Sequence, residues 1–217
     1  AARPLLEGVS PALIEELEGM ADGAALPFDA MWLLQNAAWF TALEDKQSLF
    51  QTPLCTMFAA LGDRAGADDL LVARNLDWAD EELPVVTEVR PEQGRHFIQV
   101  GFTWNTGVFT GMNDAGLVVC MERTPGLGMP DLKGAPLEMR LRELLQTAER
   151  PAQVVEQLLA QPNLRGFHVL VAGIEKTKSQ AVLVACGGAP ATRDPQDGLL
   201  LGADPAAPYL EDDAKIR

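Results

Sequence analysis

Apolar residues near the start of the chain recur every three or four positions, a spacing that is typical of an amphipathic helix. Ser10 and Pro11 supply an N-cap and a first-turn proline, and the helical spacing then covers residues 13–25. A second helical pattern covers residues 27–43. We therefore predict that residues 1–54 form a helical leader.

The periodicity changes to that of strands after the leader. Two short apolar runs, residues 54–61 and 70–76, flank a stretch rich in Gly, Asp and Ala at residues 62–69, which predicts a β-hairpin. A meander of antiparallel strands is predicted to follow, with a turn at residues 113–116 before its last strand. Its strand candidates are residues 85–89, 96–102, 108–110 and 117–121.

Helical spacing returns at residues 136–160, and the Arg150–Pro151 junction divides this segment into two predicted helices. Strands, then helices, then strands, without strict alternation, predict an α+β layered fold rather than a doubly wound parallel sheet. We expect residues 55–217 to form the core of one structural domain together with the leader. The last strand candidates are residues 167–172, 181–185 and 199–201, and residues 205–217 are predicted to be irregular.

Composition and charge narrow the classes of function. The 217 residues, 47% apolar and 22% charged, are typical of a soluble globular domain. A net charge of -14 repels phosphate backbones, so we expect no nucleic-acid partner. No apolar run approaches the ~20 residues that a membrane span needs. The N-terminus lacks the layout of a signal peptide, which leaves a cytoplasmic protein and an exported one with its signal removed as alternatives.

The three cysteines are an odd number and none lie in close pairs, so we expect neither a disulfide scaffold nor a metal or cofactor bound through them. Cys120 lies within an apolar strand candidate and Cys186 directly follows another, which favours buried core thiols. Cys55 begins an apolar strand, and an isolated cysteine there would usually have the same role. Its neighbours change that interpretation.

The predicted hairpin brings charged side chains to Cys55. If it turns near Ala65 and Gly66, Cys55 lies opposite Leu76, one residue from Asp77 and diagonal to Arg74. Diagonal neighbours lie within about 7–8 Å, which a long side chain can reach. A guanidinium near a thiol favours the thiolate, and a carboxylate can hold an ammonium group. The alternative interpretation of Arg74 and Asp77 is a structural ion pair, but both interrupt an apolar strand, where a buried charge is costly.

A nucleophile also needs a base. His96 and His168 lie inside apolar strand candidates far along the chain, so no histidine dyad is evident. A cysteine at a new N-terminus carries its own α-amine, whose ordinary pKa of about 7.7–8 suits a general base near neutral pH. This chemistry requires cleavage of the Leu54–Cys55 bond.

Three motifs together resemble those of the choloylglycine hydrolase and penicillin acyltransferase group of N-terminal-nucleophile (Ntn) hydrolases. Cys55 and Thr56 begin a strand, residues 74–78 read Arg-Asn-Leu-Asp-Trp on the return strand, and residues 111–117 read Gly-Met-Asn-Asp-Ala-Gly-Leu. The resemblance covers most of the chain and implies a four-layer αββα sandwich of two antiparallel sheets. It also implies a precursor that cleaves itself before Cys55 and a mature enzyme that attacks linear amides through an acyl-enzyme.

The resemblance assigns roles residue by residue. Cys55 would be the nucleophile and, through its freed amine, the base, while Arg74 and Asp77 would hold and tune it. Asn75 would assist locally at the substrate or the oxyanion. Asn113 is a weaker oxyanion candidate, because turn geometry already explains it. Trp78 would line an acyl pocket, with core packing as the alternative.

Two departures from the family pattern favour a second hypothesis. Residues 202–204 read Gly-Ala-Asp where relatives carry an Asn, and residues 121–123 read Met-Glu-Arg where an oxyanion Asn is often found, although a backbone N–H can substitute. Loss of one oxyanion donor typically lowers the rate about 10²–10³-fold. The chain also stops sooner than its relatives, which predicts a truncated or compact member. The alternatives to an amidase acting on a small N-acyl substrate are a non-catalytic binding or assembly module and an esterase, and homo-oligomerisation stays open.

Overall fold

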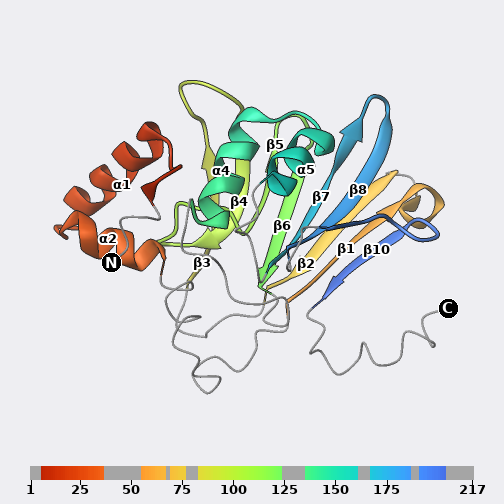
Figure 1. Ribbon diagram of the computed structural model, residues 1–217, viewed down its shortest axis with the longest axis horizontal. Helices are drawn as coiled ribbons and strands as arrows, with labels where there is room; N and C mark the ends of the chain where they lie inside the picture. The colour runs from red at the N-terminus through yellow and green to blue at the C-terminus, as the bar shows by residue number, and fades with distance from the viewer. Residues whose placement is uncertain are drawn as a thin grey trace, which may run out of the picture.

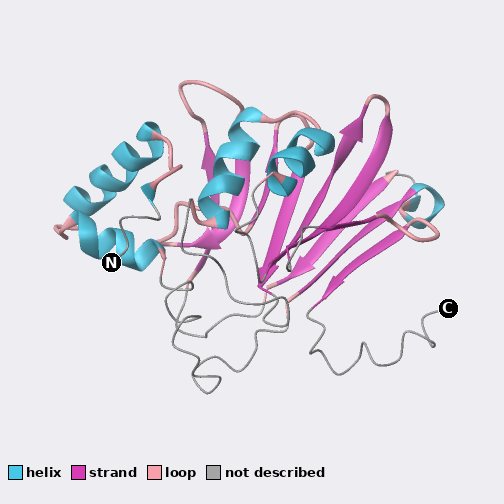
Figure 2. Cartoon of the chain, in the orientation of Figure 1, coloured by secondary structure: helices cyan, strands magenta, loops and turns pink. Residues whose placement is uncertain are grey.

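The computed structural model describes residues 6–36, 55–66, 69–76, 83–123, 135–160, 167–186 and 191–203. In this part of the chain two antiparallel sheets pack against each other, and two helices cover the far face of the larger sheet (Figures 1 and 2). The smaller sheet has the order β10 (Leu199–Ala203), β1 (Thr56–Leu61) and β2 (Leu70–Asn75). The larger sheet follows chain order: β3 (Pro84–Val89), β4 (Phe97–Phe102), β5 (Thr110–Asn113), β6 (Val118–Arg123), β7 (Phe167–Glu175), β8 (Lys178–Cys186) and β9 (Ala191–Arg193). The predicted α+β class is confirmed.

The hairpin of β1 and β2 forms with the predicted register. Thr56 pairs with Asn75 and Met57 pairs with Arg74. A short 3-10 helix, Gly62–Arg64, begins the connection, and Gly62 and Gly66 adopt positive φ angles that few other residues tolerate. The Gly-rich stretch therefore fixes both the turn and the pairing.

The position of β5 differs from the prediction. The strand expected at residues 108–110 is wrong, because β5 begins at Thr110 and continues to Asn113. The N–H of Val108 instead donates to the carbonyl of Glu138 at 2.9 Å, and the Val108 side chain is fully buried. Val108 thus packs into the core rather than pairing in the sheet, whereas the carbonyl of Phe109 still accepts from the N–H of Met121 in β6 at 2.9 Å.

The hairpin of β7 and β8 is longer than its apolar residues predicted. Residues 175–180, between the strands predicted at residues 167–172 and 181–185, are mostly strand, since Glu175 pairs with Lys178 and only two residues form the turn. The side chains at this end of the hairpin, from Ile174 to Gln180, are partly or fully exposed, so the backbone pairing continues beyond the buried apolar run.

Helices α4 (Leu137–Thr147) and α5 (Pro151–Leu159) pack on the outer face of the larger sheet and confirm the two predicted helices. Pro151 occupies the first turn of α5, where its missing N–H has no cost. The core between these helices and the sheet contains fully buried leucines and valines. These include Val119, Leu137, Leu141, Leu145, Val154, Leu158, Val169, Val171 and Val184.

The leader forms two helices, α1 (Pro11–Gly23) and α2 (Phe28–Gln35), and residues 37–43 of the predicted second helix lie outside the described residues. The Ser10 hydroxyl accepts a hydrogen bond from the N–H of Leu13 at 3.4 Å, as its N-cap position predicts. Leu17, which is fully buried, packs with Met139 of α4 in a separate hydrophobic cluster. The leader is thus attached to the core through α4, at one end of the molecule (Figure 1).

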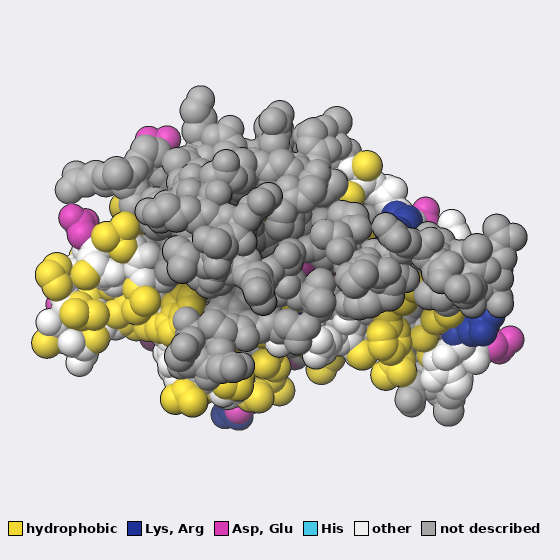
Figure 3. All heavy atoms as spheres, turned by 90° about the horizontal axis from the view of Figure 1, so that it is seen from below, with side chains coloured by type: hydrophobic (Ala, Val, Ile, Leu, Met, Phe, Trp, Pro, Cys, Tyr) yellow, Lys and Arg dark blue, Asp and Glu magenta, His cyan; other side chains and the backbone are white. Residues whose placement is uncertain are grey.

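Polar contacts strengthen this attachment. Gln35 at the end of α2 is 1% exposed, and its carboxamide oxygen accepts from both the N–H and the hydroxyl of Thr106, at 2.9 and 3.1 Å. Arg142 of α4 forms an ion pair with Glu16 of α1 at 2.9 Å, and burial lowers the pKa of this arginine against the opposing effect of the carboxylate. The opposite side of α2 exposes leucines, and Figure 3 shows hydrophobic side chains gathered over the leader helices.

The inner faces of the two sheets meet in a third cluster. Met57 and Ala59 of β1 and Leu200 of β10 pack against Leu170 of β7 and Leu183 of β8. Gly202 permits this approach, because a Cβ there would lie 2.9 Å from Met57 side-chain atoms. None of the helices in the described ranges is both long and apolar enough to traverse a bilayer.

Candidate active site

Cys55 lies immediately before β1 at one end of the space between the two sheets. Its side chain is 6% exposed and its thiol is free of any disulfide. Nη2 of Arg74 lies 3.8 Å from the Cys55 sulfur and donates to it. The diagonal approach predicted from the hairpin register is therefore present, and a permanent cation lies where negative charge on the sulfur would develop.

The guanidinium of Arg74 also connects the two sheets. Its Nη1 donates to the hydroxyl of Thr110 at 2.6 Å and to the carbonyl of Phe109 at 3.1 Å, both at the start of β5 in the larger sheet. Two acceptors on one strand and the sulfur on another fix the orientation of the planar fork. Arg74 thus positions the start of β1 against the larger sheet. Sequence reasoning did not find Thr110, because no local signal indicates which strand of the second sheet lies across from β2.

Cys120 provides an internal contrast to Cys55. It lies on β6 at 1% exposure, and burial raises the pKa of its thiol to about 11, while the Arg74 charge and a hydrogen bond with Thr110 oppose that rise. A thiol with such a pKa stays neutral near neutral pH, so the predicted core role of Cys120 is confirmed. The side chain of Cys186, at the end of β8, lies outside the description, and its core role stays a prediction.

A carboxylate and a histidine share the inner face of the larger sheet with Cys120. Glu122 of β6 pairs in register with His168 of β7, and Nδ1 of His168 lies 2.9 Å from Oε1 of Glu122. Glu122 is 1% exposed. The sequence separated these residues by 46 positions and two helices, so only the β6–β7 register brings them together.

The structure separates two of the other predicted site residues from Arg74. Asn75 pairs with Thr56, and strand alternation places it on the face of the smaller sheet opposite Arg74. Asn113 lies at the far end of β5 from Thr110, roughly 10 Å along the strand. The roles of both residues at the substrate stay predictions.

The hydrogen bonds of Asn113 stabilise the turn after β5. Its amide donates to the carbonyls of Leu145 and Ala148 at 2.9 and 2.8 Å, and its oxygen accepts from the N–H groups of Ala115 and Leu117. The third of the three recognised motifs therefore fastens the β5–β6 turn to the end of α4. On the surface of the same turn Arg95 lies 2.7 Å from Asp114, and this contact lowers the pKa of the Asp114 carboxyl.

Two further predicted site residues, Asp77 and Trp78, lie outside the described residues. The structure does describe β10, where residues 202 and 203 depart from the family pattern. Gly202 lies opposite Met57 and Ala203 lies opposite Thr56, so β10 borders the strand that follows Cys55 without an amide side chain at either position. Within the described ranges no three His, Cys, Asp or Glu side chains are grouped as metal ligands.

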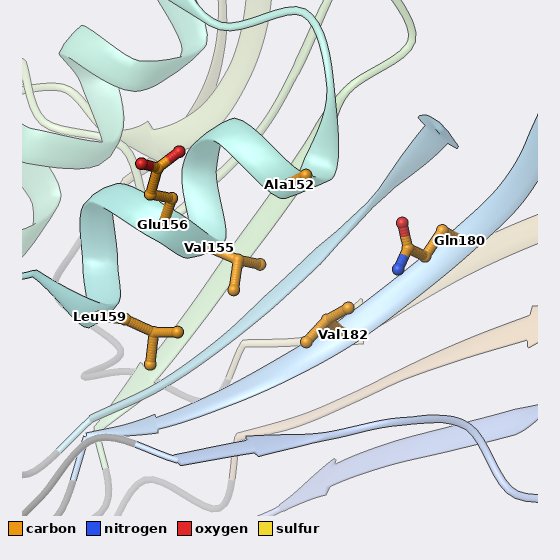
Figure 4. Close-up of a pocket in the computed structure, with 6 residues that line it drawn as sticks. All are labelled: Ala152, Val155, Glu156, Leu159, Gln180 and Val182. Carbon is orange, nitrogen blue, oxygen red and sulfur yellow. The ribbon is translucent and has the colours of Figure 1, made fainter. Parts of the chain in front are cut away.

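A groove between α5 and β8 lies on the other face of the larger sheet from Cys55. Figure 4 shows Val155 and Leu159 of α5 facing Val182 and Gln180 of β8. The lining is almost wholly apolar and carries no nucleophile. The reactive side chains, Cys55 and Arg74, therefore lie away from this groove, at one end of the space between the two sheets.

The two packed antiparallel sheets, with a cysteine at the head of a strand and an arginine against its sulfur, define the class: an Ntn hydrolase of the choloylglycine hydrolase type. The sequence matches the model of the acyl-coenzyme A:6-aminopenicillanic acid acyl-transferase family over residues 64–193, which is more than half of the chain. The chain belongs to this family, and the resemblance found in its motifs is confirmed. The matched range includes Arg74 and begins after Cys55.

Individual relatives are distant. A solved structure of the Caenorhabditis elegans ortholog of N-acylethanolamine-hydrolyzing acid amidase superposes with a TM-score of 0.53 and 16% identity, covering 69% of this chain and 70% of that one. An uncharacterized protein of Archaeoglobus fulgidus is 24% identical over an alignment of 165 residues, and the match covers 66% of this chain and 27% of the relative. The chain thus spans about a quarter of that relative's length. The worm enzyme supports the fold, and the activity has to be argued from the site.

Proposed function

We propose that this protein is a cysteine-dependent hydrolase or acyltransferase of linear amides, with Cys55 as its nucleophile. The observation that carries the proposal is the 3.8 Å contact between Arg74 Nη2 and the Cys55 sulfur, in a family of acyl-transferring enzymes. The named reactions of the family and of the worm enzyme both concern an amide bond between an acyl group and an amine. A small N-acyl amine is therefore the proposed substrate class.

In the proposed mechanism the chain first cleaves itself between Leu54 and Cys55. The released α-amine of Cys55 then removes the thiol proton, and the sulfur attacks the amide carbonyl. The amine leaves with a proton, an acyl-enzyme remains on the sulfur, and water or another amine accepts the acyl group. Arg74 holds the sulfur and stabilises its charge, and Asp77 is proposed to hold the α-ammonium.

The proposal includes the finer architecture and organisation. Residues 1–54 form the leader chain and residues 55–217 the catalytic chain after cleavage. A second helical layer is proposed to complete a four-layer αββα sandwich beside the smaller sheet. Asn75, Asn113 and Trp78 remain the candidates for contacts with substrate, and homo-oligomerisation remains open.

Acyl-enzyme trapping tests the activity. The purified protein is incubated with fluorogenic N-acyl-7-amino-4-methylcoumarins of increasing acyl length, quenched in acid and analysed by peptide mass spectrometry. We expect coumarin release and one acyl group on Cys55, with both lost in Cys55→Ala and retained in the matched Cys120→Ala. Release that persists in Cys55→Ala would contradict the assignment of the nucleophile.

A second candidate function is a binding or assembly module that has lost catalysis. The observation that favours it is the pair Gly202 and Ala203, which border β1 where relatives are expected to carry an Asn donor. This alternative predicts an intact Leu54–Cys55 bond and no acyl transfer to Cys55. A chain that stays uncut and unacylated while binding an N-acyl amine would support it.

A further inference from the structure

Gln35, at the end of α2, binds the loop between β4 and β5 through both ends of its side-chain amide. The oxygen accepts from the N–H and the hydroxyl of Thr106, at 2.9 and 3.1 Å, and the nitrogen donates to the carbonyl of Trp104. Gln35 is 1% exposed, and loss of these bonds would leave buried polar groups unpaired. A residue of the leader therefore fixes the middle of a loop in the larger sheet.

The loop continues from Thr106 toward β5 along a tightly packed path. A Cβ on Gly107 would lie 2.8 Å from the Cβ of Glu138 in α4, and the N–H of Val108 donates to the carbonyl of Glu138 at 2.9 Å. Close-packed interiors transmit displacements because they leave little room to absorb them. A shift of Thr106 should therefore reach the start of β5.

Packed aromatic rings give a second connection from Gln35 to the start of β5. The rings of Trp104 and Phe102 are nearly parallel, with centroids 5.9 Å apart, and the Phe102 ring meets the Phe109 ring edge to face at 5.8 Å. Both geometries are favourable for aromatic pairs. Gln35 holds the carbonyl of Trp104, so it supports this row of rings as well as the backbone of the loop.

Both connections end at the two groups that orient Arg74. The carbonyl of Phe109 and the hydroxyl of Thr110 accept from Nη1 of Arg74 at 3.1 and 2.6 Å. Nη2 of the same guanidinium lies 3.8 Å from the sulfur of Cys55, so displacement of either acceptor would move the charge relative to the sulfur. The position of Arg74 at the proposed nucleophile thus depends on a loop that the leader holds.

We propose that Gln35 is a positioning residue that acts through the β4–β5 loop to hold Arg74 against the Cys55 sulfur. The inference rests on the proposed amidase function and gives the leader a role in the mature site. Arg74 acts on the nucleophile rather than on the substrate, so a misplaced Arg74 should lower kcat and leave KM unchanged. Gln35 itself does not contact the substrate in this account.

Turnover of N-dodecanoyl-7-amino-4-methylcoumarin tests the positioning role. Gln35→Met keeps the length of the side chain without its amide, and it should lower kcat about 10-fold at unchanged KM, because misplacement by about 1 Å costs up to about 10²-fold. Thr106→Val loses one bond to Gln35 and should lower kcat about 3-fold, whereas Thr106→Ser keeps the hydroxyl and should match the wild type. The Thr106 pair also tests the connection if Gln35→Met fails to fold.

A control variant separates positioning from the docking of the leader. Leu17→Ala loosens the leader at the hydrophobic cluster that contains Met139 and keeps the amide of Gln35. Its kcat should match that of the wild type. A kcat that is unchanged in Gln35→Met and Thr106→Val, a loss that appears only in KM, or an equal fall of kcat in Leu17→Ala would overturn the inference.

A double-variant cycle makes a second test independent of catalysis. If the wild type does not hydrolyse the probe, the proposed function fails, and urea midpoints are compared in a Cys55→Ala background. Arg74→Lys weakens bonds to the acceptors that Gln35 is proposed to hold, so its midpoint shift of roughly 1 M should shrink by about half when Gln35→Met is also present. The shift should be undiminished beside Leu17→Ala. A shift of the same size with and without Gln35→Met would overturn the inference.

Discussion

Arg74 connects the two sheets and also contacts the sulfur of the proposed nucleophile, so its replacement should lower the stability of the fold. Arg74→Lys keeps the charge, but the lysine stem is one atom shorter and its ammonium falls short by roughly 1.3 Å, one C–N bond. The two bonds at risk join Nη1 to Thr110 at 2.6 Å and to Phe109 at 3.1 Å. Loss of one such charged hydrogen bond, net of solvation, costs about 2 kcal/mol.

Urea denaturation measures this cost. The experiment uses a Cys55→Ala background, which the proposed chemistry leaves as one chain and which removes the sulfur contact from the comparison. A loss of about 2 kcal/mol should lower the urea midpoint by roughly 1 M. The matched control is Arg90→Lys, since Arg90 and its partner Glu88 are both more than half exposed, and such pairs contribute little. If Arg74→Lys is tolerated as well as Arg90→Lys, Arg74 does not hold the sheets together.

Three further predictions concern the packing. Leu17→Ala should lower the free energy of unfolding by about 2–5 kcal/mol, while Leu33→Ala, at a site 50% exposed, should lower it by under about 1 kcal/mol; similar losses would contradict the docking of the leader. Burial raises the pKa of Cys120 from 9.0 to about 11, so the neutral thiol should stabilise the fold fully below pH 9 and lose this effect as the pH approaches 11. Urea titrations across this pH range should show the loss of stability in the wild type and not in Cys120→Ala. Gly202→Ala should lower the melting temperature through a 2.9 Å contact with the Met57 side chain, and Met57→Ala should relieve that contact, so additive effects of the two changes would refute it.

The sequence predicted local structure better than it predicted the contacts between the two sheets. The Gly-rich connection of the first hairpin determines its register, so the approach of Arg74 to Cys55 could be derived without coordinates. The same holds for Ser10 as an N-cap and for the break before Pro151, because each depends on residues a few positions apart.

The contacts that complete the site depend on long-range packing. Thr110 contacts Arg74 only because the two sheets pack together, and Glu122 contacts His168 only through the register of β6 with β7. Neither the packing of one sheet on the other nor the pairing of β6 with β7 can be predicted from a single sequence. The misplaced strand at Val108 has a similar cause, since α4 supplies the hydrogen-bond acceptor that a neighbouring strand was expected to supply.

The central claim is that Cys55 acts as an N-terminal nucleophile, and the chemical state of residue 55 tests it most directly. Intact-mass analysis with N-terminal sequencing of the purified protein should give two chains, one of which begins with Cys55, and a single chain for Cys55→Ala. Arg74→Lys should slow the cleavage, and the bond that is cut should still be the one between Leu54 and Cys55. A wild-type chain in which residue 55 stays in peptide linkage to Leu54, or a cut that persists in Cys55→Ala, would contradict the account.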